Sequence, residues 1–178
     1  MKKYILLILS LLTIFVLYKQ VSAEESIIPD EAIRFRVIAN SNSVYDQNVK
    51  IQVRNMVQNK LLELTGKSTD IEETRQVIKS NIDVIDNMVG QKLKEINYDS
   101  KYKIKYGYNY FPKKKYKGIT YKEGNYESLV IELGDAKGNN WWCVLFPPLC
   151  LLESEENQES SDTEYTFFVK ELVDKYFK

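Results

Sequence analysis

The chain of 178 residues carries 25 basic and 25 acidic side chains, no histidine and 44% hydrophobic residues, which suits one domain with a hydrophobic core. The absence of histidine excludes Ser-His-Asp and Cys-His catalysis, and it removes the most common nitrogen ligand of zinc. A formal net charge of zero gives no indication of a nucleic-acid partner.

The N-terminus has the pattern of an export signal. Two lysines precede an apolar run from Ile5 to Leu17, and Val21-Ser22-Ala23 supplies the small side chains that a signal peptidase reads. The apolar run is shorter than the roughly 20 residues that span a bilayer as a helix. We therefore predict a signal peptide over residues 1–23 and one secreted domain over residues 24–178. An uncleaved signal anchor is the alternative.

A strand and a long helix come next. Residues 33–39 alternate between two faces, one of them carrying two arginines, and this alternation predicts a strand. A turn of Asn and Ser residues follows, and Ser43 with Asp46 forms a capping box that predicts the start of a helix. Gly66 is a suitable end for that helix. Its apolar face contains Val49, Val53, Met56, Val57, Leu61 and Leu64.

A second helical segment is predicted from the capping box of Thr69 and Glu72. Its apolar stripe continues to Ile96, with Asn81 or Gly90 as a kink or break. Both predicted helices have charged outer faces, so we expect them to cover one side of a sheet.

The segment Lys101–Tyr110 places tyrosines on one face and lysines on the other. Such regular alternation predicts an antiparallel strand whose tyrosines pack inward while its lysines face water. Interleaved aromatic and basic residues also occur where proteins bind anionic polymers or membrane surfaces. A secreted binding module for anionic cell-wall or membrane surfaces is therefore an alternative function.

Two more strands and a helix complete the predicted fold. Tyr126–Leu133 and Trp141–Phe146 are short strands, and the second must end at Pro147, because proline has no backbone donor and a fixed φ. Residues 153–164 include six acidic residues and no basic one, which predicts a solvated loop before a closing helix over residues 165–177. Grouped helices predict an α+β fold: a mainly antiparallel sheet of about four strands, covered by two N-terminal helical segments, with a C-terminal helix.

The sequence offers little catalytic chemistry. Ser100 and Lys103 match the S-x-x-K pattern of penicillin-recognising enzymes, but that pattern must open a helix and here it opens a strand. No phosphate-binding loop, dinucleotide fingerprint or nucleophile elbow occurs. We predict no enzyme activity, no cofactor and no metal site. A secreted hydrolase that uses carboxylates alone is a weaker hypothesis.

The two cysteines, Cys143 and Cys150, lie on either side of the Pro-Pro pair. A catalytic thiol would lack a histidine to raise its thiolate fraction, whereas export leads to an oxidising compartment. We predict that the two residues form an intramolecular disulfide, for which their Cα atoms must lie within about 7 Å.

Three segments resemble the stage II sporulation protein R family. They are IPDEAIRFRVIANSNS at Ile28–Ser43, DQNVKIQVR at Asp46–Arg54 and WWCVLFPPLC at Trp141–Cys150. The order of signal peptide, strand, helices and Trp-Trp-Cys strand also matches, and the similarity covers most of Ile28 to Leu151. The acidic stretch and the closing helix lie outside these motifs.

The resemblance implies a role in endospore formation. Members of that family are made in the forespore and secreted across its membrane into the space between forespore and mother cell. There they activate a membrane-embedded aspartic protease, stage II sporulation protein GA, which cleaves the precursor of the mother-cell sigma factor E. On this interpretation the chain is a ligand rather than a protease, and no catalytic positions carry over.

We expect the motif segments to contact that partner, because arginine and tryptophan are the residue types most often found as interface hot spots. The predicted contact residues are Arg34, Arg36, Asn40, Ser41, Trp141 and Trp142. Adjacent strand residues point to opposite faces, so we expect one tryptophan to be buried and the other to be available.

Overall fold

The computed structural model describes residues 4, 8, 10–13, 27–116, 118–150 and 162–177. Most of the predicted signal peptide and the acidic stretch up to residue 161 lie outside this part of the chain. Within it, no helix has both the length and the apolar character that a membrane span requires.

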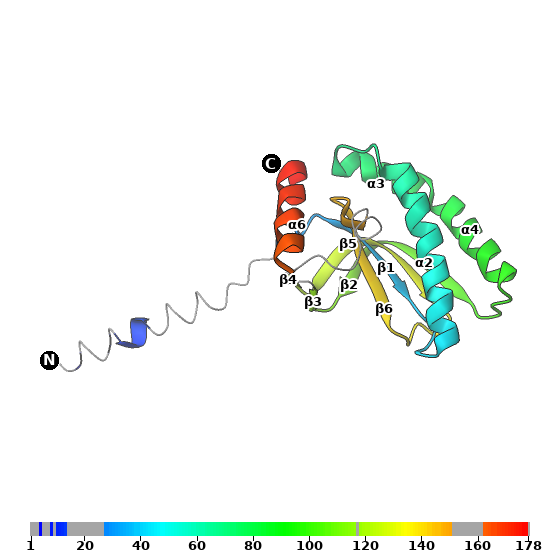
Figure 1. The fold of residues 1–178 in the computed structure, drawn as a ribbon, viewed down its shortest axis with the longest axis horizontal. Coiled ribbons are helices and arrows are strands. Elements are labelled where there is room, and N and C mark those ends of the chain that lie inside the picture. Colours follow the sequence, from blue (N-terminus) through cyan, green and yellow to red (C-terminus); the bar gives the residue numbers. More distant parts are fainter. Residues whose placement is uncertain are drawn as a thin grey trace.

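The fold is built on a four-stranded sheet in the order β2-β5-β1-β6 (Figure 1). The inner strand β1 (Ile33–Ile38) is parallel to β5 (Gly124–Leu133) and antiparallel to β6 (Asn140–Phe146). The edge strand β2 (Tyr102–Phe111) pairs with β5 in antiparallel register. Two of the three strand pairs are therefore antiparallel, and the predicted α+β class with a mainly antiparallel sheet is confirmed.

Three helices cover one face of this sheet (Figure 1). The first, α2 (Val44–Thr65), begins as predicted at Ser43, whose hydroxyl accepts a hydrogen bond from the Asp46 amide at 3.1 Å. The helix ends as predicted before Gly66. Its buried apolar residues recur every fourth position and pack on the sheet; they are Val49, Val53, Val57 and Leu61.

The second predicted helical segment is two helices, α3 (Ile71–Ser80) and α4 (Ile82–Glu95). Asn81 separates them, because its side chain donates a hydrogen bond to the Val77 carbonyl at 2.8 Å while its own backbone leaves the helical region. Gly90, the other candidate for a break, lies inside α4.

The cap of α3 is one residue later than predicted. Asp70, not Thr69, accepts the hydrogen bond from the Glu73 amide, at 2.8 Å. A carboxylate accepts this bond while also placing negative charge at the positive end of the helix dipole, and this combination favours Asp70.

The opposite face of the sheet is covered at one end by a helix and a hairpin (Figure 1). The helix α6 (Asp162–Phe177) is the predicted closing helix and begins three residues earlier than expected. The hairpin of β3 (Lys114–Tyr116) and β4 (Ile119–Tyr121) was not predicted, because strands of three residues are too short for alternation to reveal. A second apolar cluster joins these elements; it contains Ile28, Ala32, Ile119, Val144, Leu149, Tyr165 and Val169.

The tyrosines of β2 pack inward over only half of the strand. Tyr102 and Tyr106 lie against α4 and α3, and the Tyr106 hydroxyl donates to Glu127 at 2.8 Å. Tyr108 and Tyr110 are 76% and 56% exposed, so the expectation of a fully inward tyrosine face is wrong. Alternation assigns side chains to a face, but only the helices decide how much of that face is covered.

Candidate functional site

The sheet face opposite the three helices carries the two arginines of the first motif. In the β1–β6 register, Arg34 lies opposite Val144 and Arg36 lies opposite Trp142. Residues directly opposite each other share a face, so the first and third motifs meet on this side of the sheet. The Arg36 guanidinium lies 5.5 Å from the Trp142 ring and donates a hydrogen bond to the Tyr110 carbonyl.

The two tryptophans lie on opposite faces, as adjacent strand residues must. Trp141 packs edge-on against Phe35 on the helix side, with the Arg54 guanidinium 5.1 Å from its ring. Trp142 packs edge-on against Phe111, and their ring centroids are 5.5 Å apart. Both are half-buried, so the expectation that one would be buried and the other available is wrong.

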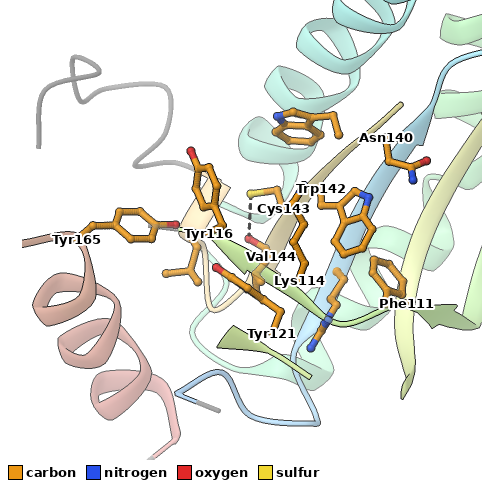
Figure 2. Close-up of a pocket in the computed structure, with 12 residues that line it drawn as sticks. Phe111, Lys114, Tyr116, Tyr121, Asn140, Trp142, Cys143, Val144 and Tyr165 are labelled. Atoms are coloured by element: carbon orange, nitrogen blue, oxygen red, sulfur yellow. Dashed lines mark hydrogen bonds between the residues drawn. The ribbon is translucent and has the colours of Figure 1, made fainter. Parts of the chain in front are cut away.

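A cavity of about 140 Å³ opens beside Trp142 (Figure 2). Its lining side chains converge from β1, β2, β3, β4, β6, α6 and the segment after β6, and apart from the Asn140 amide they are aromatic, apolar or basic, without a carboxylate. They are Arg34, Phe111, Lys114, Tyr116, Tyr121, Asn140, Trp141, Trp142, Cys143, Val144, Leu149 and Tyr165. The Lys114 ammonium lies 4.9 Å from the Trp142 ring. A cavity with this lining does not suit hydrolysis by paired carboxylates, which would have to face each other in a pocket.

Arg34, one of the predicted contact residues, is 2% exposed and lines this cavity, and its contact with a partner stays a prediction. Its guanidinium carbon lies 3.3 Å from the centroid of the Tyr126 ring and 5.4 Å from that of Phe111. These rings stabilise the cation through their negative faces. Burial lowers the pKa of Arg34, but a guanidinium keeps its proton under all physiological conditions.

Several buried polar atoms at this site have no hydrogen-bond partner among the described residues. They are Nε and Nη2 of Arg34, Nε1 of Trp142, Oδ1 of Asn140 and, on the neighbouring Arg36, Nε. A buried donor without an acceptor costs free energy, so a ligand that supplies acceptors would bind favourably here.

The predicted disulfide is present and forms part of the cavity wall. Cys143 and Cys150 are bonded, with their Cα atoms 5.6 Å apart. The bond joins the middle of β6 to the segment after the Pro-Pro pair, and it thereby holds Leu149 next to Val144 in the second apolar cluster.

Asn40 and Ser41 have structural roles at the turn after β1. Both donate hydrogen bonds to the Asp46 carboxylate, at 3.1 Å and 2.5 Å, and Asn40 Oδ1 accepts from the Asp135 amide at 2.8 Å. The turn after β5 requires a glycine at position 134, because the φ of Gly134 is 57° and a Cβ at this position would collide with the Asn40 side chain. Contact of these two residues with a partner stays a prediction.

Ser100 and Lys103 do not form a serine-lysine pair at a helix start. Ser100 is exposed in the bend before β2, and Lys103 is exposed within that strand. The S-x-x-K pattern therefore lacks the helical context that its chemistry requires.

Sequence reasoning missed the residues that complete the cavity: Phe111, Lys114, Tyr116, Tyr121, Asn140, Cys143, Val144, Leu149 and Tyr165 as lining positions. The Lys/Tyr-rich composition around Lys101–Tyr121 was the available signal, and it was interpreted only as a strand or a charged surface. Their convergence depends on the hairpin, which no local pattern predicted, and on the packing of α6, which the sequence predicted as a helix without indicating where it lies.

Comparison with known proteins gives a consistent family match. A protein-family model described as "Stage II sporulation protein R" matches residues 29–156. The curated protein "Stage II sporulation protein R" of Bacillus subtilis (strain 168) is 36% identical over 153 residues, which is 83% of this chain and 68% of the relative. No solved structure matches.

Proposed function

Because the chain belongs to the stage II sporulation protein R family, we propose that it is an intercompartmental signalling protein of endospore formation. In this proposal the forespore secretes it into the space between forespore and mother cell. There it activates a membrane-embedded aspartic protease, stage II sporulation protein GA, which processes the sigma factor E precursor. The protein acts as a ligand and is not itself an enzyme.

The observation that carries the mechanism is the basic and aromatic site formed by the motif segments. Arg36, Trp142 and Lys114 lie together beside a cavity, and they are residue types suited to binding a protein surface. An activator can act only through different affinities for two states of its partner. We propose that this site binds the outward-facing part of the protease and favours its active arrangement.

Co-expression with the protease and the sigma-factor precursor tests this function. Trp142→Ala and Arg36→Ala should each weaken processing, by roughly thirtyfold in affinity if they are hot spots worth about 2 kcal/mol. Lys115→Ala is the control, because Lys115 is exposed and lies on the same hairpin as Lys114 but outside the cavity lining. Normal processing with both folded variants would contradict this choice of surface.

The exposed tyrosines of β2 keep the alternative function open. Tyr108 and Tyr110 lie on the edge strand together with the exposed Lys103, an arrangement able to contact anionic wall polymers or lipid head groups. Binding to anionic vesicles that weakens as salt rises would support it, since charge interactions in solution are screened within about 10 Å at 0.1 M salt.

A further inference from the structure

The Arg34 guanidinium presents two buried donors without partners, and they lie on one edge of the group. Nε and Nη2 form the side-on fork of a guanidinium, which matches the two oxygens of a carboxylate. The side chain is 2% exposed and lines the cavity, so an acceptor can reach this fork only from within the cavity. The Tyr126 and Phe111 rings lie 3.3 Å and 5.4 Å from the guanidinium carbon, and they leave Nε and Nη2 without a hydrogen-bond partner among the described residues.

The other end of the cavity offers complementary hydrogen-bonding groups. Asn140 Oδ1 is an unpaired acceptor, and Trp142 Nε1 is an unpaired donor between the two ends. Asn140 is four positions from Val144, the cross-strand neighbour of Arg34, so the site extends about 13 Å along β6. A peptide can supply a carboxylate for Arg34, a backbone N–H for Asn140 and a carbonyl for Trp142.

The volume of the cavity and the charge of its lining residues indicate which side chains it can bind. A cavity of about 140 Å³ accommodates a single aromatic or branched apolar side chain, since a dry cavity of about 150 Å³ holds benzene. Arg34 and Lys114 line it, and no acidic residue does, so the charge complement is negative.

We propose that this cavity binds a short peptide segment in which an apolar side chain adjoins a carboxylate, with Arg34 as the bidentate carboxylate ligand. The occupant is a segment of the protein partner, and that assignment rests on the proposed function. The carboxylate site itself does not, because it follows from Arg34 and the cavity alone.

The test uses two small probes on the purified exported protein, 3-phenylpropionate and its neutral isostere 3-phenylpropionamide, with binding measured by calorimetry. The carboxylate should bind at least tenfold more tightly, as expected for hydrogen bonds to a charged group. It should also shift the Nε–H proton resonance of Arg34, which the amide should leave in place. Arg34→Lys keeps the charge but loses the fork, and it should remove most of the carboxylate preference. Lys103→Gln removes one exposed charge outside the cavity and is the control.

Each outcome decides the proposal. Equal binding of the two probes, or no shift of the Arg34 resonance at millimolar carboxylate, would overturn it even if Arg34→Lys fails to fold. Tighter probe binding after replacement of Glu153, Glu155 and Glu156 by glutamine would assign the cavity to the chain's own acidic stretch and overturn the partner assignment.

The partner assignment has its own readout. Acidic-to-amide variants of the protease's outward-facing segments should lose binding, and 3-phenylpropionate should compete with the unaltered segment. If the protein binds the carboxylate probe but has no effect on the protease, the carboxylate site stands and the proposed function is refuted. If the protein activates the protease but binds both probes equally, the proposed function stands and the carboxylate site is refuted.

Discussion

Reduction of the Cys143–Cys150 disulfide should lower the free energy of unfolding by about 2.5 kcal/mol. The bond closes a loop between residues seven positions apart. In the chain-entropy model, opening a loop of that size returns about 2.5 kcal/mol of conformational freedom to the unfolded chain. For a domain of about 150 residues this loss corresponds to a fall in Tm of about 5–10 °C.

Reduction is the cleaner perturbation because it leaves both sulfur atoms in place. Cys150 is fully buried and Cys143 is 9% exposed, so a Cys143→Ala/Cys150→Ala double variant also loses packing. The free energy of unfolding of that variant should therefore be lower than that of the reduced protein by about 1 kcal/mol or more, and its Tm should be lower as well.

Thermal unfolding of the exported protein, followed by circular dichroism with and without reductant, measures the effect. Alkylation and mass spectrometry establish the thiol count of each sample. A reduced sample with two free thiols and a Tm within about 2 °C of the oxidised protein would refute the loop-entropy argument. Two free thiols in the natively exported, untreated protein would show that the bond does not form there.

Four further results are expected. Asp46→Asn should cost about 1 kcal/mol, because the amide oxygen that replaces Oδ2 can still accept from both Asn40 and Ser41 but lacks the negative charge that strengthens the two bonds. Hydrogen bonds from Ser41, then from Asn40 and the Ser43 hydroxyl, hold the Asp46 pKa below 3.8. The stabilisation from this carboxylate is therefore present above about pH 4 and is lost as the pH falls through the folded-state pKa. Urea unfolding between pH 6 and pH 2 should show that the stability of the variant depends less on acid than that of the unaltered protein. Glu127→Gln should cost about 2 kcal/mol or more in denaturant unfolding, because Glu127 is 6% exposed and accepts from Arg75 and Tyr106; a loss below about 0.5 kcal/mol would contradict the importance of this cluster. Ser100→Ala should change stability and precursor processing by less than about 0.5 kcal/mol, and a folded variant that abolishes processing would revive the enzyme hypothesis. Intact-mass measurement of the exported protein should give a chain that begins at Glu24, and retention of Met1 would contradict cleavage.

Local features of the sequence determined most of the element boundaries. Ser43 and Gly66 delimit α2, and Pro147 ends β6, because caps and prolines act through bonds within a few residues. The apolar spacing of Val49, Val53 and their successors identified the packed face of α2 for the same reason. The pairing of the cysteines followed from their number and from the short loop between them.

The tertiary structure alone decided which of these residues meet and how deeply each is buried. Arg34 occupies a polar position in an alternating strand, so its sequence context indicates a solvent-facing side chain, yet Phe111 and Tyr126 from β2 and β5 enclose it. Period-two alternation distinguishes the two faces of a strand, but it carries no information about what covers either face. The order β2-β5-β1-β6 and the placement of α6 supply that information through contacts between residues far apart in the chain. The cavity and its unpaired donors exist only because of those contacts.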